Sequence, residues 1–152
     1  MGTDEIRLPV ILIVEDDEDD RLLVAKALAQ AQIPTDTRFV EDGEELIDYL
    51  HRRGTWLDLA NSPRPSLILL DLRMPRKDGL TALLEVKSDE RFKRIPVIVL
   101  TTSANEDEVE RAWDAGVSGF ITKPASRGGL HRVANAIRDY WFGVITFPKI
   151  SD

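Results

Sequence analysis

Val10-Ile-Leu-Ile-Val14 decides the fold of this 152-residue chain, and six acidic residues, Glu15-Asp-Asp-Glu-Asp-Asp20, follow it directly. The first five residues form a continuous run of β-branched and aliphatic side chains of strand length. Such a run is typical of a strand that is buried on both faces. A buried strand that ends abruptly in charge predicts a polar site at the carboxyl edge of a parallel sheet.

Strand-like and helix-like segments alternate along the rest of the chain. Four further strands are expected, at residues 37–40, 67–70, 96–100 and 119–122. Five helices are expected from the spacing of apolar residues, at 19–31, 43–52, 80–87, 105–115 and 126–141. Residues 54–66 contain Asn61, Pro63 and Pro65 and are expected to form a loop. Buried strands that alternate with amphipathic helices predict a parallel sheet covered on both faces.

The composition argues against several classes of protein. The chain has 20 basic and 27 acidic residues, a formal net charge of −7, which argues against a nucleic-acid-binding surface. It has no cysteine, so disulfides, thiolate zinc sites and cysteine nucleophiles are excluded. No apolar run is long enough to cross a bilayer, and residues 1–7 lack the apolar stretch of a signal peptide. We therefore expect a cytoplasmic protein without a nucleic-acid or membrane partner.

Four of the expected strands end in polar residues that complement one another: Glu15 and Asp16, Asp71, Thr101, and Lys123. Because the carboxyl ends of parallel strands meet at one edge, these side chains are expected to converge. Clustered carboxylates without cysteine or histidine favour a hard divalent cation, Mg²⁺ above all, with Mn²⁺ or Ca²⁺ as alternatives. A lysine and a hydroxyl would bind an anion beside it. The set predicts phosphoryl transfer to an aspartate nucleophile.

Each of these residues also has a simpler structural explanation when it is taken alone. Acids at a helix start, such as Asp17 to Asp20, usually form a solvated first turn that suits the helix dipole. Asp71 could form a turn, Thr101 could cap a helix, and Lys123 could be a solvated surface lysine. These explanations account poorly for the joint occurrence at four strand ends.

The sequence resembles the receiver domains of the two-component response-regulator family from about Val10 to Ile137. Four motifs carry the resemblance: Ile11–Asp17, Leu69–Pro75 with Asp78-Gly79, Pro96–Thr101, and Ala115–Pro124. The resemblance implies an α/β, flavodoxin-like (βα)5 fold, a doubly wound parallel sheet of five strands in the order 2-1-3-4-5 and three layers. It implies one receiver domain over residues 1–152, with a core at about 9–140 and an apolar tail at 141–152.

The resemblance also implies a role for each site residue. Asp71 would be the phosphoacceptor, Thr101 and Lys123 would bind the phosphoryl group, and Phe120 would be the aromatic residue that switches rotamer. Oxygens of four residues would bind Mg²⁺: Glu15 through water, Asp16, Asp71, and the backbone carbonyl of Arg73. The Lys123–Pro124 peptide bond is expected to be cis, as in many relatives.

Two residues depart from the common pattern of the family. Thr102 stands where relatives often have alanine, and Arg73 places a long cation two residues after the phosphoacceptor. Both flank the site, and we expect them to tune the rate of dephosphorylation in a direction that the sequence does not give. A narrower resemblance, in residues 50–65 and in the tail from Trp141 to Pro148, is to small single-domain regulators paired with bacterial phytochrome histidine kinases.

The sequence therefore predicts a phosphorylation-dependent switch rather than an enzyme that turns over a substrate, although it would assist its own phosphotransfer and dephosphorylation. Its partners would be a phytochrome-type histidine kinase and a second copy of the chain. The dimer would use the face of the fourth helix, fifth strand and fifth helix, together with the tail. Trp113 is either core or interface, and the tail either folds back on the core or forms a dimer arm.

Three other functions explain the same residues less well. A stand-alone Mg²⁺-dependent phosphatase with an aspartate nucleophile is the main alternative, although such enzymes usually carry a second acid where this chain has Arg73. A flavin- or nucleotide-binding module would need a phosphate-binding loop after the first strand, where six acids would repel the ligand. A purely structural role would leave the convergent polar residues unexplained.

Overall fold

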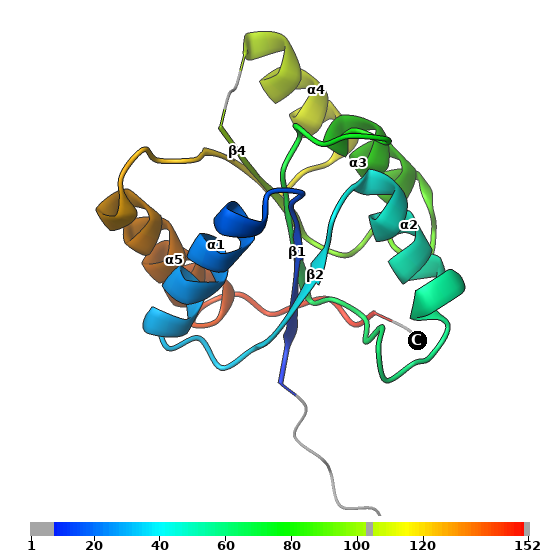
Figure 1. The fold of residues 1–152 in the computed structure, drawn as a ribbon, viewed down its shortest axis with the longest axis horizontal. Coiled ribbons are helices and arrows are strands. Elements are labelled where there is room, and N and C mark those ends of the chain that lie inside the picture. The colour runs from blue at the N-terminus through cyan, green and yellow to red at the C-terminus, as the bar shows by residue number, and fades with distance from the viewer. Residues whose placement is uncertain (1–7, 103–104, 151–152) are drawn as a thin grey trace, which may run out of the picture.

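Five strands alternate with five α-helices in residues 8–102 and 105–150, the part of the chain that the computed structural model describes (Figure 1). The strands are β1 (Val10–Val14), β2 (Asp36–Val40), β3 (Leu67–Leu70), β4 (Val97–Thr101) and β5 (Gly119–Thr122). The helices are α1 (Glu18–Gln30), α2 (Gly43–His51), α3 (Gly79–Ser88), α4 (Glu106–Ala115) and α5 (Arg127–Trp141). The predicted loop 54–66 also contains a short 3₁₀ turn, η1 (Gly54–Trp56).

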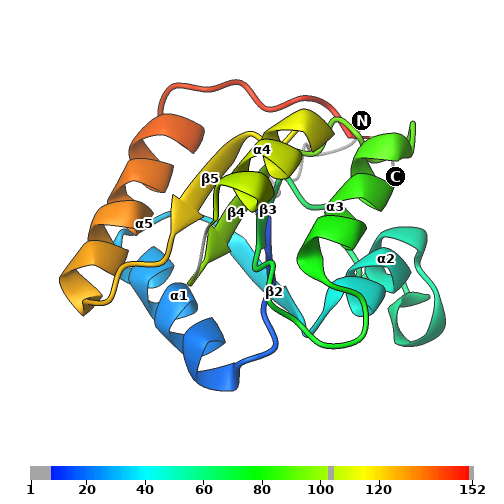
Figure 2. The ribbon, with the colours of Figure 1, turned by 90° about the horizontal axis from the view of Figure 1, so that it is seen from above.

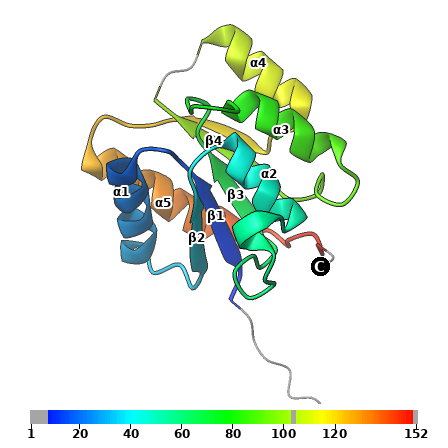
Figure 3. The ribbon, with the colours of Figure 1, turned by 45° about the vertical axis from the view of Figure 1, so that its right-hand side comes forward.

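The strands form one parallel sheet in the order β2-β1-β3-β4-β5, with helices on both faces. Helices α1 and α5 pack against each other on one face, and α2, α3 and α4 cover the other, as Figures 2 and 3 show. The predicted fold class, strand order and three layers are therefore confirmed. Within the described residues, no helix combines the length and the apolar character needed to cross a membrane.

The helix boundaries follow from local capping. Each α-helix begins after a side chain that accepts a hydrogen bond from the backbone amide three residues on. The five capping residues are Asp17, Asp42, Asp78, Asn105 and Ser126. The left-handed backbone at Gly116 ends α4, as the sequence indicated. The observed ends of the elements lie within two residues of the predicted ones.

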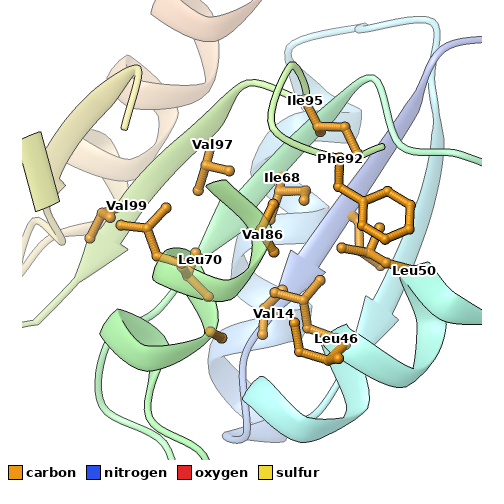
Figure 4. Close-up of a cluster of buried hydrophobic side chains, with 14 of the residues drawn as sticks. Val14, Leu46, Leu50, Ile68, Leu70, Val86, Phe92, Ile95, Val97 and Val99 are labelled. Atoms are coloured by element: carbon orange, nitrogen blue, oxygen red, sulfur yellow. The ribbon is translucent and has the colours of Figure 1, made fainter. Parts of the chain in front are cut away.

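The core consists of two hydrophobic clusters, one on each face of the sheet. Successive residues of β1 and β3 point to opposite faces, so Val14, Ile68 and Leu70 face α2 and α3 (Figure 4), whereas Ile13 and Leu69 face α1 and α5. The three central strands, β1, β3 and β4, are buried along their whole length, which explains why their sequences are continuously apolar rather than alternating.

Tyr49 anchors the long loop between α2 and β3 to the core. Its ring is fully buried and lies 5.0 Å from that of Trp56, and its hydroxyl donates a hydrogen bond of 2.5 Å to the carbonyl of Pro63. Burial raises the pKa of Tyr49 to about 12. The hydroxyl of Ser62 closes the same loop through the carbonyls of Trp56 and Asp58. The loop therefore has a defined path despite its irregular backbone.

The apolar segment after α5 folds back on the chain. Phe147 lies 6.1 Å from Trp141 in a stacked arrangement and 5.4 Å from Phe142, and all three pack against the cluster under α1 and α5. The segment then runs along the amino-terminal edge of the sheet (Figures 1 and 2), and Ile150 packs against the opposite cluster. Of the two explanations for the tail, folding back on the core is the one observed in this chain.

Lys87, at the end of α3, is a largely buried cation with no carboxylate partner among the contacts of the described residues. Its ammonium donates to the backbone carbonyls of Lys93 and Ile95, at 3.0 and 2.6 Å. Burial lowers the pKa of Lys87 to about 8. In the unfolded chain the same lysine keeps its proton up to about pH 10.4.

We expect the free energy of unfolding to rise with pH between about 8 and 10.4, because the unfolded state then binds more protons at Lys87 than the folded state. The slope due to Lys87 reaches at most about 1.4 kcal/mol per pH unit. Denaturant unfolding at several pH values should show that Lys87→Met removes this slope. The exposed Lys26 of α1 provides the control, Lys26→Met. Equal slopes in the wild type and in Lys87→Met would contradict the effect of burial.

Candidate phosphoryl-transfer site

The residues predicted from the strand ends meet at the carboxyl edge of the sheet. The ammonium of Lys123 lies 2.5 Å from Oε2 of Glu15 and 3.3 Å from Oδ2 of Asp71. The hydroxyl of Thr101 donates a 2.9 Å hydrogen bond to Oδ1 of Asp71. Asp16 lies beside Glu15 and is exposed. The structure thus brings together all five side chains that the strand ends predicted.

Backbone hydrogen bonds between neighbouring strands fix these positions. The amide of Glu15 donates to the carbonyl of Val40, and the amide of Asp71 donates to that of Val14, each at 3.1 Å. The amide of Lys123 donates to the carbonyl of Thr101 at 2.7 Å. The parallel ladder therefore continues one residue beyond each apolar run, and its last residues carry the side chains of the candidate site.

Burial and charge act on these groups in opposite directions. Asp71 and Glu15 are 5% and 3% exposed. Burial opposes the charge of Asp71, but hydrogen bonds, including one of 3.0 Å from the backbone amide of Arg73, and the charge of Lys123 hold its pKa below the ordinary value. Burial and the neighbouring Asp71 raise the pKa of Glu15. Although burial opposes it, the carboxylates raise the pKa of Lys123.

Glu15, Asp16 and Asp71 fit the ligand set of a hard divalent cation. Each offers one carboxylate oxygen, and these oxygens lie within 4.8 Å of one another. A single ammonium neutralises only part of the negative charge at this edge, so a divalent cation would relieve the remaining repulsion between the carboxylates. The residues present therefore fit Mg²⁺ or Mn²⁺. The expected ligation by the Arg73 carbonyl stays a prediction.

The loop after Asp71 is held in place by close backbone contacts. A Cβ on Gly79 would lie 2.2 Å from the carbonyl oxygen of Asp71, so only glycine permits this approach. The amide of Gly43 at the start of α2 donates to the carbonyl of Lys77. The buried Asp42 accepts a 2.6 Å hydrogen bond from Arg76, whose backbone is left-handed with φ of 62°. Helix α2 therefore fixes the far end of this loop.

Two interactions were not predicted from the sequence. Asp20, which was expected to be a solvated residue of the first helical turn, contacts Lys123 at 3.2 Å. The guanidinium of Arg73 forms a 2.5 Å ion pair with Glu108 of α4. Asp20 lies in the first turn of α1, which begins at Glu18, and a run of six acids does not show which of them turns back toward the strand end.

The remaining sequence predictions concern Phe120, Trp113 and the Lys123–Pro124 bond. Phe120 of β5 is half-buried and packs against the cluster under α2 and α3. Trp113 of α4 is 52% exposed, so it does not belong to the core. No peptide bond in the described part of the chain is cis, so the expectation of a cis Lys123–Pro124 bond is wrong. The ladder bond from Lys123 to Thr101 forms with this peptide in the trans state.

The fold and the site define a receiver, a domain that takes up a phosphoryl group on an aspartate at the edge of a doubly wound sheet. The chain belongs to the response regulator receiver domain family, whose model matches residues 11–135. The predicted family is therefore confirmed: the chain is a signalling switch, and its relatives do not favour a stand-alone phosphatase.

The chain is similar to several response regulators over almost its whole length. Response regulator Rcp1 of Synechocystis sp. is 40% identical over 147 residues, which cover 96% of this chain and 98% of the relative. The solved structure of the phosphorylated cyanobacterial phytochrome response regulator RcpA has a TM-score of 0.85 and 42% identity and covers 93% of this chain and 99% of its own. The Mn²⁺-bound form of Rcp1 has a TM-score of 0.84, 39% identity and the same coverage.

We expect Gly79→Ala to lower the free energy of unfolding by about 1–3 kcal/mol and to reduce Mg²⁺ affinity, because the added methyl group must displace the Asp71 backbone. Gly128→Ala is the matched control, since Gly128 also lies in the first turn of a helix but faces open space. Denaturant unfolding and calorimetric Mg²⁺ titration measure the two effects. If the two variants behave alike, the close approach at Gly79 does not constrain the site.

Proposed function

We propose that Asp71 accepts a phosphoryl group from the phosphohistidine of a sensor histidine kinase, and that this change switches the contacts of the chain. The supporting observation is the arrangement of one buried aspartate between a hydroxyl and an ammonium, beside two further carboxylates suited to a divalent cation. Such a set suits in-line phosphoryl transfer. The chain would assist both its own phosphotransfer and its own dephosphorylation.

The contacts of Asp71 favour one oxygen as the nucleophile. Oδ1 already accepts hydrogen bonds from Thr101 and from the amide of Arg73, whereas Oδ2 faces Lys123. We propose that Oδ2 forms the new O–P bond while the P–N bond of the phosphohistidine breaks and the imidazole keeps its electron pair. Lys123 donates to the transferred group. A divalent cation held by Glu15, Asp16, Asp71 and the Arg73 carbonyl would neutralise phosphoryl charge.

The conformational response would begin at Thr101. Its hydroxyl now donates to Asp71, and in the phosphorylated chain it would donate to a phosphoryl oxygen instead. We propose that Phe120, half-buried on the neighbouring strand, turns into the space that Thr101 leaves. The surface of α4, β5 and α5 would then change its affinity for partners. Thr102 and Arg73 flank the site and would tune the lifetime of the acyl phosphate.

The partner that the relatives support is a phytochrome-type histidine kinase. RcpA is described as a phytochrome response regulator, and this chain matches almost its whole length. Residues 1–152 would form one receiver domain, with a core at about 9–140 and a tail at 141–152. The protein would act in the cytoplasm. The net charge of −7 supports the absence of a nucleic-acid partner.

A homodimer is the second part of the proposal. Trp113 of α4 and Tyr140 of α5 are each 52% exposed, and Val144 of the tail is 76% exposed. Large exposed apolar side chains on elements of the switching surface support a contact with a second copy. Because the tail packs on its own chain, it would not form a swapped arm, and only its exposed residues would contribute to the dimer contact.

We expect Asp71→Asn to abolish labelling by acetyl phosphate with Mg²⁺, because the amide cannot form the acyl phosphate. Intact-protein mass spectrometry measures the added phosphoryl group. Asp114→Asn, at an exposed position of α4, is the control and should label like the wild type. Labelling should stop at one phosphoryl group per chain. Full labelling of Asp71→Asn, or steady turnover of phosphate esters, would refute the proposed role.

We expect Trp113→Ala to weaken dimerisation of the beryllofluoride-treated chain by about tenfold or more, as the loss of a buried interface tryptophan does. Sedimentation equilibrium measures the dissociation constant. Leu84→Ala on α3 is the control, because Leu84 is 45% exposed but lies outside the proposed face. A wild type that stays monomeric, or equal dissociation constants for both variants, would exclude this interface.

A further inference from the structure

The ammonium of Lys123 is surrounded by three carboxylates, one for each of its N–H groups. Besides Glu15 and Asp71, it donates to Oδ2 of Asp20 at 3.2 Å. Glu15 and Asp71 belong to the group of acids that could hold a metal, and in the described residues that group does not include Asp20. Asp20 therefore has a contact with the lysine that the metal site does not require.

The first turn of α1 fixes Asp20 relative to the site. Its amide donates to the side chain of Asp17 at 3.0 Å, and the amide of Asp17 donates to Oε1 of Glu15 at 3.1 Å. Arg21 on the same turn donates to the backbone carbonyl of Glu15. The side chain of Asp20 is 36% exposed, whereas that of Lys123 is 10% exposed. The carboxylate of Asp20 thus stands at the mouth of the site, between solvent and the ammonium.

We propose that Asp20 is a positioning residue that restrains Lys123 and thereby slows the phosphorylation of Asp71. It occupies one N–H of the ammonium, and it keeps a negative charge where the phosphoryl donor, itself an anion, must approach. The inference rests on the proposed function, since it assumes that Lys123 binds the transferred group. Glu15 and Asp71 are needed for the metal and for transfer, so Asp20 is the partner of Lys123 whose removal leaves both in place.

The size of the effect follows from the charge alone. Removing one negative charge a few ångströms from an arriving anion, at a partly solvated position, changes the rate by about three- to tenfold. The direction is an increase, because the repulsion of the arriving anion falls and a neutral side chain at position 20 binds the ammonium of Lys123 less strongly than a carboxylate does.

The chain offers a closely matched control for this test. Asp19 precedes Asp20 on the same turn, is exposed, and contacts no cation among the described residues. Asp19→Asn and Asp20→Asn make the same change in net charge, but only Asp20→Asn removes the negative charge of an ion pair with Lys123. Asp20→Glu keeps the charge and, with its longer side chain, can still reach the ammonium.

The experiment measures the rate of labelling by acetyl phosphate at saturating Mg²⁺ for the wild type and the three variants. We expect Asp20→Asn to label about three- to tenfold faster than the wild type, and Asp19→Asn and Asp20→Glu to stay within about twofold. The second readout needs no metal: nitrogen-15 NMR of the ammonium should show faster proton exchange at Lys123 in Asp20→Asn and unchanged exchange in Asp19→Asn.

The two readouts separate this inference from the proposed function. A wild type that is never labelled refutes the proposed function, and Lys123 then has no phosphoryl group to bind. If the wild type is labelled but Asp20→Asn labels no faster than Asp19→Asn, or labels more slowly, Asp20 does not restrain transfer and the inference is wrong. Unchanged ammonium exchange in Asp20→Asn would likewise contradict a restraint on Lys123.

Discussion

The contact between the Lys123 ammonium and the surrounding carboxylates is the interaction on which the site depends. Two of its partners, Glu15 and Asp71, are almost completely buried, and their carboxylate oxygens lie within 4.8 Å of each other. Buried carboxylates this close repel each other unless a cation lies beside them. The ammonium permits both to sit at the end of apolar strands. It offsets the repulsion only in part, however, and the remaining negative charge makes this edge of the sheet suitable for a divalent ion.

This charged edge needs a rigid frame, which the sheet and α2 supply together. The ladder bonds that end at Glu15, Asp71 and Lys123 continue the strand pairing into the site. The loop beyond Asp71 is packed against the sheet at Gly79 and tied to α2 through Asp42 and the amide of Gly43. Because the backbone of Asp71 is held on both sides, its carboxylate can exchange hydrogen-bond partners while its position stays fixed.

The sequence predicts the features that depend on residues close together in the chain. The apolar run Val10–Val14 and the acids that follow it indicated a buried parallel strand and a polar edge, and both are observed. The contact of Asp20 with Lys123 was missed because a run of six acids does not show which of them faces the site. The pair of Arg73 and Glu108 joins residues 35 positions apart, and charges at exposed positions have many possible partners.

The sequence allows two interpretations of the tail for a similar reason, since apolar residues indicate burial but not the surface that buries them. In the structure it touches both hydrophobic clusters, through Phe147 on one side of the sheet and Ile150 on the other. The tail therefore connects the layers on the two faces of the sheet. Trp141 packs on the cluster under α1 and α5, and Trp56 packs on the cluster under α2 and α3. Thermal unfolding followed at these two tryptophans should consequently show a single cooperative transition, in which neither layer unfolds before the other.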